Sequence, residues 1–319
     1  IAGNSSTTFE ITFNPASTGL KSAVISIAND DGDENPYTFT IQGTGTAVPN
    51  MSVSGNAMQI TNGDIEPSES DDTDFGSVNI AGDPIEHTFT IANNGSASLT
   101  LTGSSPYVSL TGDTEDFTLT QLPASNIAAG GGTTTFKITF KPTATGNRSA
   151  TVSIANDDDS KNPFNFSIRG SGISVPTVTT AAASSVTKTV ATLGGNVTSD
   201  GASPITETGV VYSSSNATPT IGGMDVIQNA NIDLSGDFSE SISPLSSATH
   251  YYFQAYATNA AGTSYGGVLE FTTLTSVVSI LRAGPDDTNA ASVRWNVVFE
   301  NNVTGLSASN FTLVSFGIS

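Results

Sequence analysis

The sequence predicts an all-β chain of tandem antiparallel β-sandwiches, joined end to end like beads on a string. Short segments in which apolar and polar residues alternate recur about every ten residues, with turn residues between them. Ser, Thr, Gly, Asn and Asp dominate the composition, as is typical of strands and turns. In addition, one long stretch of the sequence occurs twice, which indicates repeated modules.

The repeat defines the first two modules. A stretch that begins at Thr7 with TTFEITF returns at Thr133 as TTTFKITF, and the two copies stay in step at a spacing of about 127 residues. We therefore expect residues 1–49 to be the C-terminal part of one module and residues 50–176 to be a complete module. A Val-Pro pair closes each copy, and proline stiffens a short linker.

Alternation assigns the strands of the complete module in order. Period two gives a strand one buried face and one face in water. Glycine, proline and Asn-Asp runs separate the strands. The residues expected to point into the core are, strand by strand, Phe89 and Ile91; Leu99 and Leu101; Phe117 and Leu119; Phe136, Ile138 and Phe140; Ala150, Val152 and Ile154; and Phe164, Phe166 and Ile168.

The complete module also carries a family pattern. Its stretches SVSGNAMQITNGDIEPSESDDTDFGSV, HTFTIANNGSASLTLTG and FKITFKPTATGNRSATVSIANDD resemble the bacterial choice-of-anchor D domain. The resemblance covers residues 50–176. It implies an immunoglobulin-like fold in an exported protein that is held at the bacterial surface.

Two further module types follow. Residues 177–274 resemble a fibronectin type III-like module through LSSATHYYFQAYATNAAGTSYG, although the tryptophan usual in that family's second strand is absent. The resemblance implies that Tyr251 bonds its hydroxyl to nearby backbone. Residues 275–319 resemble the N-terminal part of a further bacterial Ig-like domain. With about half a module at each end, either the chain is a window on a longer protein or neighbouring subunits complete the halves.

Charge and composition exclude several classes of partner. Lys and Arg number 9 against 29 Asp and Glu, a formal net charge of −20. So acidic a surface repels nucleic acid and anionic membrane surfaces. No apolar run reaches the roughly 18 residues that a membrane helix needs, so we expect no direct membrane insertion. The chain has no cysteine, which excludes disulfides and thiolate metal sites.

The acidic turns are the candidate metal sites, because Ca²⁺ is bound by oxygen ligands. Asp31, Asp33 and Asn35 have the spacing of a calcium loop, but Pro36 replaces its glycine and Gln42 stands at the position of its last glutamate. The alternative is that the Asn-Asp-Asp runs simply form turns by bonding their own backbone. The residues proposed as calcium ligands are Asp30, Asp31, Asp33, Asp157 and Asp158; no other cofactor is predicted.

The sequence predicts no catalytic residue. Residues 262–266 match G-x-S-x-G, but a nucleophile elbow needs a helix after it, and the following GVLEFTT predicts a strand. His87 and His250 each lack the second imidazole that a histidine metal site needs. We interpret both histidines as structural.

The sequence therefore favours a non-catalytic stalk or spacer in a long extracellular adhesin or fibre of the bacterial cell surface. Its partners would be neighbouring modules of the same chain and other surface or filament proteins. One alternative is a set of accessory modules in a large secreted hydrolase, whose catalytic domain would lie elsewhere in the reading frame. The other is a self-assembling extracellular filament subunit, completed by strands of its neighbours.

Overall fold

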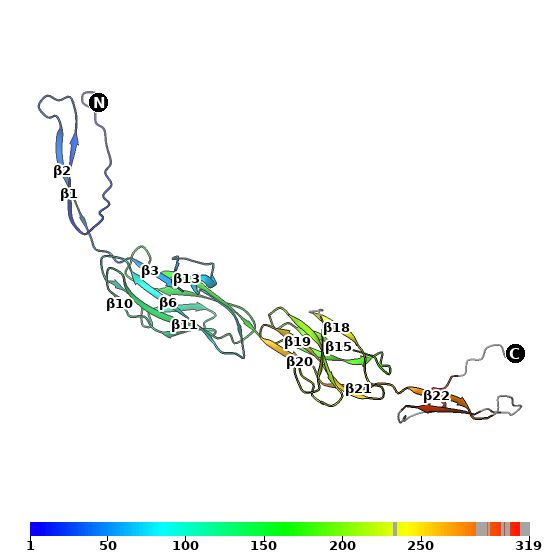
Figure 1. Cartoon of the computed structure of the whole chain (residues 1–319). Coiled ribbons are helices and arrows are strands. Elements are labelled where there is room, and N and C mark those ends of the chain that lie inside the picture. The colour runs from blue at the N-terminus through cyan, green and yellow to red at the C-terminus, as the bar shows by residue number, and fades with distance from the viewer. Residues whose placement is uncertain (232–234, 285–291, 293, 301–302, 304–306, 313–319) are drawn as a thin grey trace. The chain divides into compact units, whose positions relative to one another are not determined.

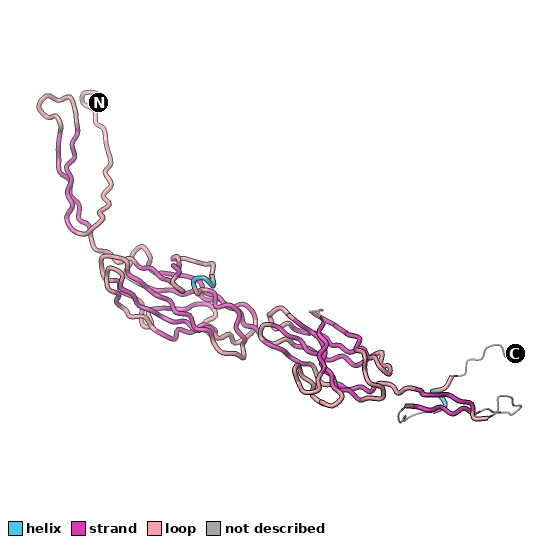
Figure 2. Tube along the Cα trace, viewed as in Figure 1, coloured by secondary structure: helices cyan, strands magenta, loops and turns pink. Residues whose placement is uncertain are grey.

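The computed structural model describes residues 1–231, 235–284, 292, 294–300, 303 and 307–312 (Figure 1). Apart from two short 3-10 turns, η1 (Glu69–Asp71) and η2 (Ala308–Asn310), its regular structure consists of antiparallel strands (Figure 2). The predicted all-β fold is confirmed. Contacts divide the chain into two units, Ile1–Gly172 and Ile173–Ser319. The predicted domain boundaries at residues 49, 176 and 274 stay predictions, and the division falls near the second of them.

The first unit opens with a hairpin of β1 (Gly19–Ile27) and β2 (Tyr37–Gly45). The two copies of the repeat differ here in burial. Phe9 is 60% exposed, whereas its counterpart Phe136 is fully buried. The stretch around Phe9 forms no strand, while its counterpart is strand β11 of the sandwich. Phe136 is buried because its strand, β11, pairs on both sides with strands that precede it in the complete module, β6 and β9.

Residues 51–173 form a sandwich of two antiparallel sheets, with strand orders β4-β3-β6-β11-β9 and β5-β13-β12-β8, and a small β10-β7 pair. All the strands expected from alternation are present, whereas β3, β4, β5, β8 and β10 were not predicted. The bounds are β3 (Met51–Gly55), β4 (Met58–Ile60), β5 (Asp74–Asn79), β6 (Ile85–Asn93), β7 (Leu99–Thr100), β8 (Val108–Gly112), β9 (Phe117–Gln121), β10 (Asn126–Ile127), β11 (Gly132–Phe140), β12 (Gly146–Ile154) and β13 (Phe164–Ile173).

Phenylalanine rings fill the space between these sheets. Phe117 and Phe140 stack with ring centroids 4.6 Å apart, and Phe89 and Phe136 stack at 5.3 Å. A Cβ at Gly170 of β13 would lie 2.4 Å from the ring of Phe140, so only glycine lets the ring approach that strand. Buried phenylalanines each contribute about 3–5 kcal/mol when judged by truncation to alanine. The core therefore supports this module without disulfides.

The second unit holds a sandwich with strand orders β14-β15-β18 and β17-β16-β19-β20, where β21 also pairs with β19. The hydroxyl of Tyr251 accepts a hydrogen bond from the backbone N–H of Ser246 at 3.0 Å, as predicted. The bounds are β14 (Thr177–Ser184), β15 (Ala191–Ser199), β16 (Glu207–Ser213), β17 (Ile227–Asn231), β18 (Gly236–Ile242), β19 (His250–Asn259), β20 (Gly262–Tyr265), β21 (Leu269–Thr272) and, in a following hairpin, β22 (Val277–Arg282) and β23 (Trp295–Phe299).

Candidate functional site

The acidic turn between β12 and β13 is organised by a buried asparagine. The side-chain amide of Asn156 donates to the carbonyls of Ile154 and Lys161, both at 3.0 Å, and its oxygen accepts from the N–H of Asp158 at 2.9 Å. Asp157 accepts a hydrogen bond from the N–H of Thr100 at 2.8 Å. These side chains therefore bond backbone, as the turn hypothesis expects.

Asp158 is buried and joins two distant parts of the module. One carboxylate oxygen accepts from the N–H of Met51 at 2.9 Å, and the other accepts from the N–H and hydroxyl of Ser160 at 3.1 and 2.6 Å. Burial raises the pKa of Asp158, but the hydrogen bonds from Ser160 and Met51 outweigh burial and leave that pKa below its usual value. The folded state thus favours the charged carboxylate.

The equivalent turn between β1 and β2 keeps part of this pattern. Asn29 donates to the carbonyl of Glu34 at 2.8 Å and accepts from the N–H of Asp31 at 2.7 Å. A side-chain hydrogen bond with Asp33, and then the N–H of Asp33, lower the pKa of Asp31. Asp30 lies exposed beside them. Asp31 and Asp33 are thus brought together, and both are exposed.

The fold of the described residues does not bring the candidate calcium ligands into one cluster. Across the described residues, no group of three or more His, Cys, Asp or Glu side chains is arranged to hold a metal ion. Asp157 and Asp158 already accept backbone hydrogen bonds, which occupy part of their capacity as ligands. Calcium binding at the five aspartates stays a prediction.

The residues that lead into the complete module, here called the first lead-in segment (residues 48–51), are held by hydrogen bonds to that module. The carbonyl of Val48 accepts from the N–H groups of Ser96 and Ala97 at 2.9 and 3.1 Å. The ammonium of Lys161 donates to the side chain of Asn50 and to the carbonyl of Met51, both at 2.6 Å. The segment is therefore bonded to the module on both sides of Pro49.

A fully buried asparagine, Asn93, also holds the first lead-in segment to the module. Its oxygen accepts from the N–H groups of Asn50 and Gly95 at 3.1 and 3.0 Å, and its amide donates to the carbonyl of Ala97 at 2.8 Å. A Cβ at Gly95 would lie 2.4 Å from the carbonyl oxygen of Val48. Only glycine therefore allows the segment to lie this close.

The second lead-in segment (residues 174–175) repeats the same solution in a module of another sequence type. The buried side chain of Asn259 donates to the carbonyls of Ser174 and Asp200, both at 2.7 Å. The N–H of Ser174 donates to the carbonyl of Gly201 at 2.9 Å. Gly201 has a φ of +70°, and a Cβ there would lie 2.1 Å from the carbonyl oxygen of Ser174.

The two lead-in segments thus share one design: a buried asparagine and a glycine in close approach fix the backbone that enters each module. Sequence reasoning identified the Val-Pro linkers but not the residues that hold them. The Asn-Asn-Gly run at 93–95 carries a turn signal, yet nothing local indicates which backbone Asn93 bonds.

The remaining sequence candidates have structural positions. His87 stacks on Phe75 with ring centroids 4.2 Å apart, and its Nδ1 lies 2.7 Å from the carbonyl of Asp72. His250 lies 3.2 Å from the carboxylate of Glu270. The G-x-S-x-G stretch forms strand β20 and its end, and the next element is strand β21 rather than a helix. None of these positions assembles a nucleophile with a base.

Comparison with known proteins supports the fold. A sequence model of the HYDIN/CFA65/VesB-like Ig-like domain matches residues 68–171. No curated protein matches the chain in sequence. Within the described residues, no helix has the length and apolar character needed to cross a membrane.

Three solved structures are similar to parts of the chain. Domains A168–A170 of titin share 11% identity over 81% of this chain and 75% of that chain, with a TM-score of 0.39. The short sensor domain of the anti-sigma factor RsgI4 of Pseudobacteroides cellulosolvens shares 23% identity over 31% of this chain and 94% of that chain, with a TM-score of 0.25. A protein of unknown function from Porphyromonas gingivalis W83 shares 16% identity over 50% of this chain and 68% of that chain, with a TM-score of 0.28. At these values the three carry no information on what this chain binds.

Proposed function

We propose that this chain is a non-catalytic spacer in a long extracellular protein of the bacterial cell surface, an adhesin or fibre. Immunoglobulin-like modules are consistent with such a structural role. The resemblance of residues 50–176 to choice-of-anchor D domains, and of residues 177–274 to fibronectin type III modules, supports the surface location. The partners of the segment are the neighbouring modules of its own chain.

The observation that carries the proposal is the anchoring of the lead-in segments. Strand β13 ends at Ile173, and the next residue, Ser174, is already bonded to Gly201 and Asn259. At the first segment, only Thr46 and Ala47 lie between the end of β2 and the anchored Val48. Joints with so few free residues restrict bending, which is what a spacer requires and a flexible tether lacks.

The net charge of the chain also favours a spacer role. A formal net charge of −20 over 319 residues makes neighbouring chains repel one another. Self-association of the surface is thereby disfavoured, so the modules add reach without aggregating.

Joint stiffness is testable because the chain has no cysteine. Spin labels at Thr111→Cys and Ser241→Cys, both exposed strand positions in different units, report the distribution of distances between the units by pulsed electron resonance. We expect a narrow distribution that broadens in Gly201→Ala, because the new Cβ displaces Ser174.

The matched control is Gly222→Ala. Gly222 has a φ of +72° but open space around its Cβ position, so this variant carries the backbone strain without the clash. Its distance distribution should equal that of the parent chain. A distribution in the parent as broad as in Gly201→Ala would refute the spacer. The surface location is tested separately: an antiserum against the chain should label intact cells of the source bacterium.

A further inference from the structure

The second unit has an opening between the edges of its two sheets. Strand β14 lies at the edge of one sheet, and β21 pairs with β19 at the edge of the other. The two edges meet at both ends: a Cβ at Gly266 would lie 2.6 Å from the N of Thr180, and the N–H of Leu274 donates to the carbonyl of Thr187 at 2.9 Å. Between these points, the register of β14 with β15 shifts between Ala181 and Ser184, and the intervening alanines of β14 line an opening toward β21.

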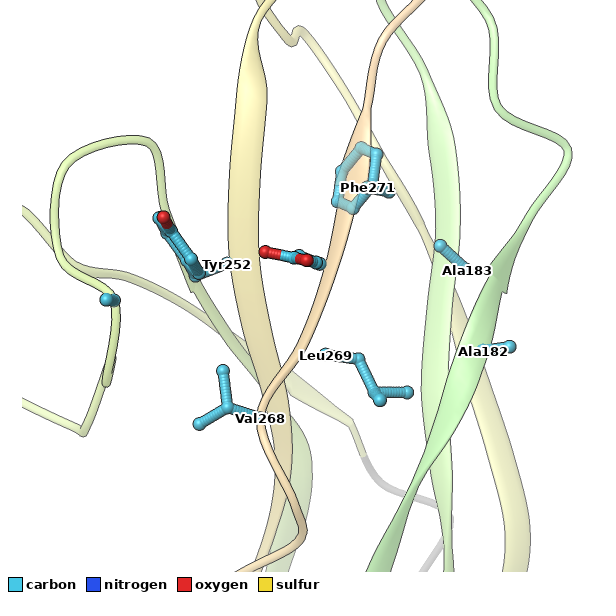
Figure 3. Close-up of a pocket in the computed structure, with 8 residues that line it drawn as sticks. Ala182, Ala183, Tyr252, Val268, Leu269 and Phe271 are labelled. Carbon is cyan, nitrogen blue, oxygen red and sulfur yellow. The ribbon is translucent and has the colours of Figure 1, made fainter.

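The opening forms a groove of about 510 Å³, here called the β14–β21 groove. Leu269 projects from β21 toward Ala182 and Ala183, while Val268 lies on the side of Tyr252 (Figure 3). Leu269 and Val268 are 37% and 38% exposed although both are apolar. The full lining is Ala182, Ala183, Ala217, Tyr252, Val268, Leu269, Glu270 and Phe271.

Backbone groups of β21 face this groove. The N–H of Thr273 bonds the carbonyl of Thr249, and the pairing continues as Thr272 with His250 and Glu270 with Tyr252. Hydrogen-bonded pairs alternate along an antiparallel ladder, so the N–H and C=O of Glu270 and Thr272 point away from β19. They offer an extended peptide a free edge.

Charge selects the kind of peptide. Glu270 stands in the middle of the edge and its side chain is 65% exposed. Within the described part of the chain, its ion-pair partner is His250, which is charged only when protonated. A second copy of this chain, with a net charge of −20, is repelled. Residues opposite each other across a β-pair share a face, so a basic side chain opposite Glu270 alternates with apolar side chains opposite Leu269 and Phe271.

We propose that the β14–β21 groove binds an extended segment of a partner protein with alternating apolar and basic residues, by adding a strand to β21. The apolar residues lie against Leu269, Phe271 and Ala183, and the basic residue pairs with Glu270. This inference does not depend on the spacer role, since a spacer and a non-spacer present the same groove. It gives the segment a lateral partner in addition to its neighbours along the chain.

The test uses the full chain and a fluorescein-labelled peptide of sequence SVKVKVS in an anisotropy titration. We expect saturable binding that is weakened about tenfold by Glu270→Lys, which replaces attraction by repulsion. Ala182→Leu, at an exposed position, fills the groove without entering the core and should weaken binding comparably. Glu115→Lys makes the same change of net charge at an exposed residue of the other unit and should leave binding unchanged.

Two control peptides separate groove binding from attraction to an acidic protein. The peptide SVVKKVS has the same composition without alternation, and SVEVEVS has the alternation with opposite charge; both should bind at least about tenfold more weakly. Absence of saturable binding would overturn the proposal, as would equal binding by the Glu270→Lys and Glu115→Lys chains. Glu270 would then be a charge that protects an edge strand from pairing.

Discussion

Replacement of Asn93 by alanine tests the anchoring of the first lead-in segment. The side chain is fully buried and accepts from the N–H groups of Asn50 and Gly95, at 3.1 and 3.0 Å. It also donates to the carbonyl of Ala97 at 2.8 Å and to those of Ile127 and Ala128, both at 3.2 Å. The side-chain amide has two hydrogens for these three carbonyls, so the five contacts amount to roughly four bonds. At about 1 kcal/mol net for each bond, Asn93→Ala should cost about 4 kcal/mol, since alanine leaves buried partners unsatisfied.

Hydrogen exchange measured by mass spectrometry is the suitable assay, because it reads each module of one chain separately. A loss of about 4 kcal/mol accelerates the slowest amides of β6 and β11 by about 10³-fold. Peptides from residues 177–274 should keep their rates and serve as an internal control.

The neighbouring Asn94 provides the matched variant. Its side chain is exposed and donates to the hydroxyl of Ser52 at 2.9 Å. Asn94→Ala should cost less than about 0.5 kcal/mol, as expected for a surface change. If Asn93→Ala and Asn94→Ala differed by less than about 1 kcal/mol, the role assigned to the buried asparagine would be refuted.

Three further predictions concern titration and metal. The pKa of Asp158 is lower in the folded chain, so the contribution of its carboxylate to stability is present above the unfolded pKa of about 3.9 and is lost as the pH falls through the folded pKa. In Asp158→Asn, the unfolding midpoint measured by calorimetry should therefore fall less steeply as the pH is lowered. Burial, and then the hydrogen bond to Glu207, raise the pKa of Tyr256, so its contribution is present below about pH 10 and is lost as the pH rises further; Tyr256→Phe should therefore weaken the dependence of the midpoint on alkaline pH. If calcium binds the turn of Asp31 and Asp33, calcium at ten times its Kd should stabilise the first unit by about 1.4 kcal/mol, an effect that Asp31→Asn should remove; an unchanged midpoint in calcium would exclude the site.

The strands that sequence analysis missed have a common cause. β6 and β11 are long and alternate cleanly, so period two identifies them. β3 reads MSVSG, which is too short and too poor in large apolar residues to stand out, although Met51 and Val53 are buried. Its inclusion depends on pairing with β6, and a single sequence does not display that pairing.

The candidate site divides in the same way. The acidic turns are visible in the sequence because Asn and Asp bond backbone within a few residues. The contact of Asp158 with Met51 joins residues 107 positions apart, and no local signal indicates it. The same holds for the groove beside β21, which exists because β14 and β21 part between two points of contact.

By itself, then, the sequence determined the fold class, the repeated module and the faces of its main strands, because alternation and turn chemistry act over a few residues. Only the tertiary structure decided which asparagine became a buried anchor, which carboxylate reached a distant N–H and which edge remained open. Those outcomes depend on contacts between segments far apart in the chain, where packing selects one partner among many that are chemically equivalent.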